Sequence, residues 1–220
     1  MEAYRSEEEQ LEALKRWWKE NGTAILVGIS VALAGVFGYK GWQNHQLSVA
    51  AEASALYSDL LEVSGKSAQG DLSDEDKASL DHLANQLKTE FSDTTYAVFA
   101  AFVKAKQAVA QKDLAAAKTE LEWVLKQDID TNLKLVTKLR LARVIFAESA
   151  DQADKALALV ENIDAGKFAA NYESFKGDVY LAQGDQAKAR EAYQKALDAS
   201  KDNGQPNLFI QVKLDDLAVQ

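Results

Sequence analysis

The sequence has no cysteine, one proline (Pro206) and eleven glycines among its 220 residues. Without cysteine, disulfides, thiolate metal sites and cysteine nucleophiles are excluded. Few helix breakers beside abundant Ala, Leu, Glu, Lys and Gln favour helix nearly throughout. The two histidines, His45 and His82, leave little for metal or acid–base chemistry. We therefore predict an all-α chain without a metal or other cofactor.

The negative charge is concentrated after residue 43. A formal net charge of −9 argues against nucleic acid as a partner. Residues 1–43 hold six acidic and five basic side chains, whereas residues 44–220 hold twenty-eight and twenty, a charge of −8. This acidity keeps the long C-terminal part soluble.

One segment is strongly apolar. Residues 21–39 contain no charged side chain, and as a helix they span about 28 Å, close to the hydrocarbon thickness of a bilayer. Trp17 and Trp18 precede the run, and Tyr39 and Trp42 end it. Aromatic side chains at both ends suit the two lipid–water interfaces. We predict a transmembrane helix over residues 21–42.

Two alternatives to an uncleaved anchor are open. A buried helix of a soluble protein would need apolar neighbours on every side. A cleaved signal peptide would use Ala32-Leu33-Ala34, a small-x-small pattern before Gly35. However, the apolar run continues past that point, and the leader is long and holds six acidic residues. An uncleaved signal-anchor is favoured.

The basic residues near the span predict its orientation. Four lie on the N-terminal side and one closely follows the span: Arg5, Lys15, Arg16 and Lys19, then Lys40. By the positive-inside rule the N-terminus is cytoplasmic. The rest of the chain then lies outside the inner membrane, in the periplasm of a Gram-negative cell, which agrees with the absence of cysteine.

The flanks and faces of this segment suggest two further features. Residues 1–20 predict an amphipathic cytoplasmic tail, because Leu11, Leu14, Trp17 and Trp18 form one apolar stripe. Within the span, one helix face carries the small residues Ser30, Ala34 and Gly38. Such a face lets another transmembrane helix approach closely. Alternatively, these residues are simply common in membrane helices.

A repeat follows a less regular region. We expect residues 43–92 to form a stalk and a first helical pair, and residues 93–220 to form repeats. Lys112–Lys118 aligns with Gly184–Arg190, seventy-two residues or two periods later. A period near 34 made of paired helices is typical of tetratricopeptide (TPR) repeats. The predicted fold is a TPR-like α-solenoid behind a single transmembrane helix.

Small and aromatic residues define the repeat. Small side chains let paired helices cross closely, and tyrosines fill the space between units. The repeat-defining positions are Ala105, Ala117, Ala142, Gly177, Tyr180, Ala189 and Tyr193. The usual first-helix tryptophan and the closing proline of a TPR unit are missing. An ordinary alanine-rich helical bundle is the alternative.

No catalytic motif is present in the sequence. Carboxylate pairs occur at Asp74/Asp76, Asp128/Asp130 and Asp215/Asp216, but such pairs act as acid and base only in a partly dry cleft. Their positions in predicted loops or helix starts favour solvation or capping. We predict a protein that is not an enzyme and has no small-molecule substrate.

The first helices of TPR units line a concave surface that accepts peptides. Phenylalanines there can hold apolar side chains, and Lys and Arg can hold carboxylates. Alternatively, the phenylalanines belong to the core and the charges are solvated. The predicted groove residues are Phe99, Phe102, Lys106, Arg143, Phe146, Asn171 and Asp178.

Several segments resemble the YfgM family, the ancillary subunit of the bacterial SecYEG translocon. They are Met1-Glu-Ala-Tyr, Glu12-Ala-x-Lys-Arg16, Glu20-Asn21-Gly22, Trp42, His45-Gln46 and Leu139-Arg-Leu-Ala-Arg-Val144. The resemblance implies a single-pass inner-membrane protein with a periplasmic TPR-like domain. It also implies association with the SecYEG translocon and with PpiD, a membrane-anchored periplasmic chaperone. The family has no catalytic residues to transfer.

The leading hypothesis is a non-enzymatic tether that links exported chains to periplasmic chaperones of the PpiD type. Membrane anchoring raises the local concentration of the repeat domain, which makes weak binding useful. The alternative is a self-associating scaffold that coordinates envelope assembly or cell division.

Overall fold

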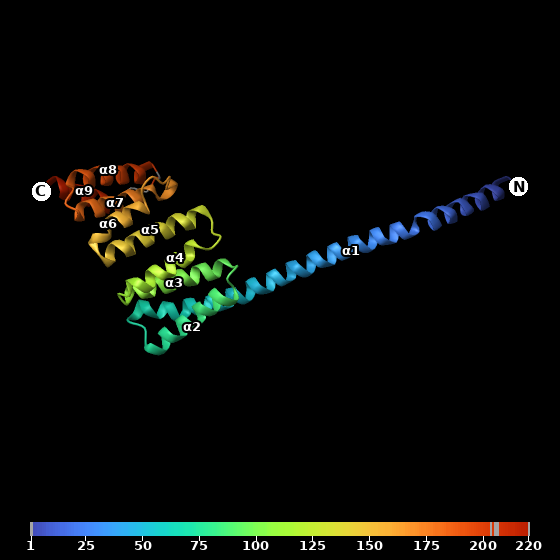
Figure 1. Ribbon diagram of the computed structural model, residues 1–220, viewed down its shortest axis with the longest axis horizontal. Helices are drawn as coiled ribbons and strands as arrows, with labels where there is room; N and C mark the ends of the chain where they lie inside the picture. Colours follow the sequence, from blue (N-terminus) through green and yellow to red (C-terminus); the bar gives the residue numbers. More distant parts are fainter. Residues whose placement is uncertain (1, 203, 205–206, 220) are drawn as a thin grey trace. The chain divides into compact units, whose positions relative to one another are not determined.

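The computed structural model describes residues 2–202, 204 and 207–219, and these residues form helices and no strand. The chain divides into two compact units, Met1–Glu52 and Ala53–Gln220. The α-helices follow in chain order in Figure 1: α1 (Glu2–Gly65), α2 (Asp74–Glu90), α3 (Thr95–Ala110), α4 (Leu114–Leu125), α5 (Thr131–Glu148), α6 (Ala153–Ala158), α7 (Ala169–Ala182), α8 (Gln186–Asp202) and α9 (Leu208–Val219). Short 3₁₀ turns occupy Lys66–Gln69, Ala150–Gln152 and Gly166–Phe168. The predicted all-α class is confirmed.

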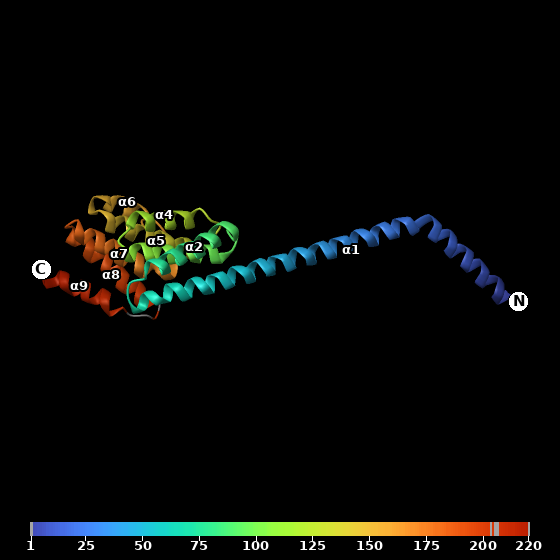
Figure 2. The ribbon, with the colours of Figure 1, turned by 90° about the horizontal axis from the view of Figure 1, so that it is seen from below.

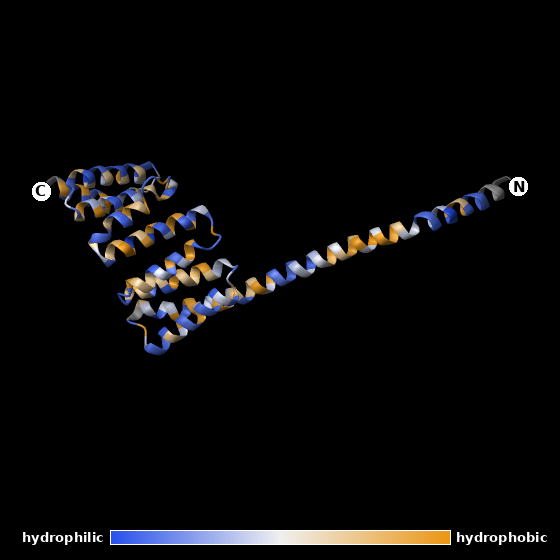
Figure 3. Cartoon of the chain, viewed as in Figure 1, coloured by the Kyte–Doolittle hydropathy of each residue, from blue (hydrophilic) through white to orange (hydrophobic). Residues whose placement is uncertain are grey.

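The first unit is the N-terminal part of α1. Among the described residues, α1 alone is long and apolar enough to cross a membrane. Its most apolar stretch, which stands out in Figure 3, is almost entirely unburied by protein. Val31, Phe37 and Trp42, for example, are exposed. A core helix of a soluble protein would bury these side chains, so α1 is a candidate membrane span rather than a buried core helix.

The predicted tail and span belong to one helix. Residues 2–65 are helical without interruption, so Asn21-Gly22 does not end a separate tail helix. The Asn21 side-chain amide donates a hydrogen bond of 3.0 Å to the Trp17 carbonyl one turn earlier. Leu11, Leu14, Trp17 and Trp18 are exposed along this part of α1.

The second unit begins inside the same helix. Ala53 and Leu60 of α1 are fully buried and pack with residues of α2 and α3. The last turns of α1 and α2 therefore form a helical pair at the start of the solenoid. This N-terminal core consists of Ala53, Leu60, Leu72, Leu80, Ala84, Leu87 and Ala100.

Side-chain caps set where the following helices begin. Ser73, Thr94, Asp113 and Asp130 each accept a hydrogen bond from a backbone N–H in the first turn of α2, α3, α4 and α5. Such caps satisfy donors that have no partner within the helix. The Ser73 hydroxyl accepts this bond from the Asp76 N–H at 3.1 Å.

The repeat is visible in two equivalent turns. Lys112 between α3 and α4 and Gly184 between α7 and α8 both have positive φ, 61° and 80°. The following aspartate donates its N–H to a carbonyl five residues back in both turns, Asp113 to Ala108 and Asp185 to Tyr180, each at 2.9 Å. This is the Schellman arrangement that ends a helix. The aligned segments thus make the same turn two periods apart.

Small residues lie where paired helices cross. Ala105, Ala117, Ala142 and Ala189 are buried, as the repeat pattern expects. Gly177 on α7 faces Tyr193 on α8: a Cβ placed on Gly177 would lie 2.5 Å from Cε1 of the Tyr193 ring. Tyr193 is fully buried, so α7 and α8 pack this closely only because position 177 lacks a side chain.

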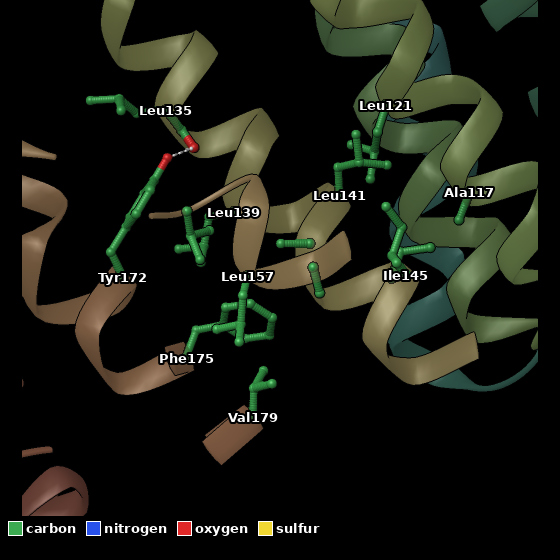
Figure 4. Close-up of a cluster of buried hydrophobic side chains, with 14 of the residues drawn as sticks. Ala117, Leu121, Leu135, Leu139, Leu141, Ile145, Leu157, Tyr172, Phe175 and Val179 are labelled. Atoms are coloured by element: carbon green, nitrogen blue, oxygen red, sulfur yellow. Dashed lines mark hydrogen bonds between the residues drawn. The ribbon is translucent and has the colours of Figure 1, made fainter. Parts of the chain in front are cut away.

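The central core joins α3 through α7. Figure 4 shows Leu139, Leu141 and Ile145 of α5 between Leu121 of α4 and Phe175 of α7. The buried Tyr172 hydroxyl donates a hydrogen bond of 2.7 Å to the Leu135 carbonyl (Figure 4). That bond ties α7 to α5.

The C-terminal core lies between α8 and α9, which pack together at the C-terminal end in Figure 2. It contains Ala189, Tyr193, Ala196, Leu197, Ile210 and Leu217. Tyr180 packs against both this core and the central core. The solenoid is therefore a series of neighbouring cores rather than one centre.

Replacing Tyr172 by phenylalanine is expected to lower the free energy of unfolding by about 1–1.5 kcal/mol, the net value of a buried hydrogen bond. The ring still fills its space, so packing is unchanged. Urea denaturation followed by circular dichroism measures the effect. The matched control is Tyr96→Phe, because the Tyr96 hydroxyl has no hydrogen-bond partner among the described side chains and backbone. An equal decrease in the free energy of unfolding in both variants would contradict a stabilising role of the Tyr172 hydrogen bond.

Candidate functional site

A groove of about 780 Å³ lies on the second unit. Its walls are the end of α1, the length of α3 and one face of α5, which are first helices of successive pairs, with two leucines from α4. Its lining residues are Tyr57, Leu61 and Ser64 of α1, Phe99, Phe102, Val103, Ala105, Lys106 and Val109 of α3, Leu114 and Leu121 of α4, and Leu133, Val136, Arg140, Arg143, Val144 and Ala147 of α5. The volume lies in the range of sites that bind ligands.

Helical periodicity gives α3 its two faces. Ala97, Ala101, Ala105 and Ala108 are buried at the contacts with neighbouring helices. The larger side chains Phe99, Phe102, Val103, Lys106 and Val109 line the groove. They recur at three- and four-residue steps, which places them on one side of the helix. Most of the small residues of α3 thus pack against neighbouring helices, while five of its larger side chains line the groove.

Aromatic rings form one end of the groove. The Tyr57 ring lies 5.9 Å from the Phe99 ring and 5.6 Å from the Tyr96 ring, between centroids. Burial raises the pKa of the Tyr57 hydroxyl above its usual value, so this hydroxyl is neutral at physiological pH. This end of the groove is apolar and uncharged.

Three cations line the rest of the groove: Lys106, Arg140 and Arg143. The Arg140 guanidinium lies 4.7 Å from the centre of the Phe102 ring, a cation–π contact. Burial, and secondly the charge of Arg143, lower the pKa of Arg140. The lining includes no aspartate or glutamate, and none of the three cations has an ion-pair partner within the described part of the chain.

Elsewhere in the second unit, several cations are neutralised by acidic side chains. Eight lysines of the second unit form salt bridges: Lys66, Lys77, Lys88, Lys104, Lys176, Lys188, Lys195 and Lys213. The groove cations lack such partners although acidic side chains outnumber basic ones in residues 44–220. The groove is therefore a local site of positive charge in an acidic domain.

The structure brings together four of the seven predicted groove residues: Phe99, Phe102, Lys106 and Arg143. It places the other three elsewhere. Phe146 packs edge-on against Phe175, with centroids 6.2 Å apart. Asn171 is exposed on α7. Asp178 accepts hydrogen bonds from the Tyr193 hydroxyl at 2.7 Å and from Lys213, so it links α7, α8 and α9.

Sequence reasoning missed Arg140 and the part of the groove from α1. Arg140 lies three residues before Arg143, the spacing that places two side chains on one helix face. Tyr57 and Leu61 were missed because the region before residue 65 reads as a stalk. The spacing of Ala53 and Leu60, two turns apart, is the signal that this stalk has a buried face.

The carboxylate pairs have structural partners or lie in solvent. Asp130 caps α5 by accepting N–H bonds of 2.7 and 3.1 Å from Asn132 and Leu133. Asp76 accepts hydrogen bonds from Lys66 at 2.6 Å and from the Ser73 hydroxyl at 2.7 Å. Asp215 and Asp216 are exposed. Asp128 and Asp130 line a hollow with Asp93 and Gln127, but both are exposed, so water reaches their carboxylates.

Ser30, Ala34 and Gly38 are exposed on α1. Apart from its chain neighbours and the backbone of its own helix, no atom lies within 4 Å of a Cβ built on Gly38. The face is thus open along the span, and its role in contact with another transmembrane helix remains a prediction.

Antiparallel helical pairs, equivalent turns and a groove lined by first helices define a TPR-like solenoid. The family model described as tetratricopeptide repeat-like domain matches residues 15–219, and the chain belongs to this family. Within it, the chain is a member of the ancillary SecYEG translocon subunits, the YfgM family.

Several relatives of this chain carry the name "Ancillary SecYEG translocon subunit". The Aggregatibacter actinomycetemcomitans protein is 36% identical over 98% of this chain and 100% of its own length. The Haemophilus influenzae protein is 35% identical over 88% of this chain and 90% of its own. The Escherichia coli K12 protein is 30% identical over the full length of both. No solved structure gives a significant match.

Proposed function

We propose that this protein is a non-enzymatic, membrane-anchored adaptor at the SecYEG translocon. The observation that carries the proposal is full-length similarity to relatives named as ancillary subunits of that translocon. A spanning helix and an open groove on the repeat domain support it, because together they supply an anchor and a binding surface.

The proposed topology follows from charge. The uncleaved span holds the chain in the inner membrane with residues 1–20 in the cytoplasm, since Arg5, Lys15, Arg16 and Lys19 outnumber Lys40. Residues 43–92 then connect the span to residues 93–220 in the periplasm. There the repeat domain is available to chains that emerge from the translocon.

In this proposal the span contacts the translocon, and the groove binds a second protein. The exposed small face at Ser30, Ala34 and Gly38 suits contact with another membrane helix. The groove binds a segment of an exported chain or of a periplasmic chaperone of the PpiD type. Anchoring keeps the groove at high local concentration beside the translocon, so modest affinity is sufficient.

Photocrosslinking in membranes tests the proposal. A photoreactive residue at Gly28 is expected to capture a translocon subunit, and one at Phe102 a chaperone or an exported chain. Gln194, exposed on α8 away from the groove lining, is the control position and should capture neither. Protease added to spheroplasts should digest the repeat domain and spare the tail. Capture of neither partner, or a protected repeat domain, would overturn the proposal.

A further inference from the structure

The groove combines three features that together specify a ligand. Its aromatic end is apolar, its middle carries unpaired cations, and its lining has no carboxylate. We infer that the groove binds a short apolar peptide segment that carries a carboxylate, with the carboxylate held by Arg140 and Arg143. This inference rests on the proposed function and specifies the chemistry of the partner segment.

The two arginines form the anionic subsite. They lie on the same face of α5, one turn apart, and each is without a carboxylate partner in the described part of the chain. Burial, and secondly the charge of Arg143, lower the pKa of Arg140, and both disfavour its charged form. The Arg140 guanidinium is positioned by the Phe102 ring. A ligand carboxylate would relieve the repulsion and make charge-assisted hydrogen bonds to both.

The aromatic end supplies the apolar subsite. Tyr57, Phe99 and Leu61 line it, and aromatic side chains at a desolvated surface make the largest contributions to peptide binding. The groove face of α3 runs from Phe99 to Val109, which is about 15 Å along the helix. That length accommodates about five extended residues or about ten helical ones. One carboxylate flanked by apolar side chains fits these dimensions.

The net charge of the domain distinguishes this ligand from a polyanion. Residues 44–220 carry a charge of −8, so a nucleic acid or a strongly acidic tail is repelled by the surface around the groove. A segment with a single carboxylate meets far less repulsion and still satisfies the two arginines. The observations therefore favour a mainly apolar protein segment.

Binding of matched peptides to the full chain in nanodiscs tests the inference. The probes are fluorescein-labelled decapeptides of alternating Leu, Phe and Ser with one central Glu and blocked termini, and the same peptide with Gln. The Glu peptide is expected to bind about ten- to a hundredfold more tightly by fluorescence anisotropy. A third peptide, with Gln and a free C-terminal carboxylate, identifies a chain end as the source of the charge if it binds as the Glu peptide does.

The variant Arg140→Gln/Arg143→Gln should bind the Glu and Gln peptides equally, because their difference comes from the arginines. Lys155→Gln, which removes an exposed cation of α6 outside the groove, should keep the wild-type preference. The variant Arg143→Glu reverses the charge at this position. It should therefore bind the same peptide with a central Lys more tightly than the Glu peptide, a change of preference that a general loss of affinity cannot produce. Circular dichroism verifies that each variant is folded.

Equal binding of the Glu and Gln peptides to the wild-type protein would overturn the inference. So would peptide binding that disappears as the protein self-associates in light scattering, because a second copy would then occupy the groove. The proposed function has a separate readout: capture of the translocon at Gly28 does not depend on the groove arginines. Loss of peptide preference with that capture intact refutes the inference alone.

Discussion

Replacing Glu120 by glutamine is expected to lower the free energy of unfolding by about 2–3 kcal/mol. The Glu120 carboxylate on α4 is nearly buried and lies 2.5 Å from the Lys88 ammonium of α2 and 3.4 Å from that of Lys104 on α3. Removing one partner of a buried ion pair costs about 3–5 kcal/mol, because it leaves uncompensated charge. The two lysine side chains are 14% and 18% exposed, so partial access to water reduces the loss.

Trp123 reports this unfolding directly. It is the sole tryptophan after residue 42, and the Lys88 ammonium lies 4.7 Å from the centre of its ring. Urea denaturation in micelles, followed by tryptophan fluorescence, therefore measures the region around Glu120. The matched control is Glu122→Gln on the same helix, since Glu122 has no ion-pair partner among the described residues. If Glu120→Gln lowers the free energy of unfolding no more than the control does, the carboxylate shared by Lys88 and Lys104 does not stabilise the fold.

Replacing Gly177 by alanine is expected to lower the free energy of unfolding by about 2 kcal/mol. The new Cβ would lie 2.5 and 2.6 Å from two atoms of the Tyr193 ring. That ring cannot move easily, because it is fully buried and its hydroxyl donates to Asp178 at 2.7 Å. Overpacking of this kind costs about 1–3 kcal/mol or more, and the better helix propensity of alanine offsets about 1 kcal/mol.

Gly65→Ala is the matched control for this substitution. Gly65 has helical backbone angles, φ −63° and ψ −28°, and no atom lies within 4 Å of a Cβ built there. The control should be neutral or slightly stabilising. Thermal denaturation followed by circular dichroism compares the two variants. If the Gly177→Ala protein is as stable as the control, α7 and α8 can move apart to accommodate a methyl group without a decrease in stability.

Local patterns predicted the repeat architecture well. The aligned Lys112–Lys118 and Gly184–Arg190 segments make the same turn. Gly177 lies at the crossing of α7 and α8, where it faces Tyr193 within the pair rather than between units. These features are readable because each is fixed by residues within one helical pair. Backbone conformation at a turn and close helix crossing both restrict residue type locally.

The groove was less predictable because it depends on how pairs stack. Asp178 lies on a first helix, as expected of a groove residue, yet Lys213, thirty-five residues later, pairs with it. The second helix of the α5–α6 pair, α6, has only six residues. Tyr57 lines the groove only because α2 folds back on the end of α1. Periodicity in the sequence can show that a helix has a buried face, but it does not show which distant helix covers that face.

The division into neighbouring cores lets the two ends of the solenoid open independently. The groove residues come from α1, α3, α4 and α5, and none comes from α8 or α9. In a repeat protein, local opening requires breaking mainly the contacts between adjacent units. Fraying of α8 and α9 therefore disrupts the C-terminal core first and leaves the groove walls in place. Amide hydrogens of α9 should therefore exchange many times faster than those of α3. The groove would then stay folded while the C-terminal helices open locally.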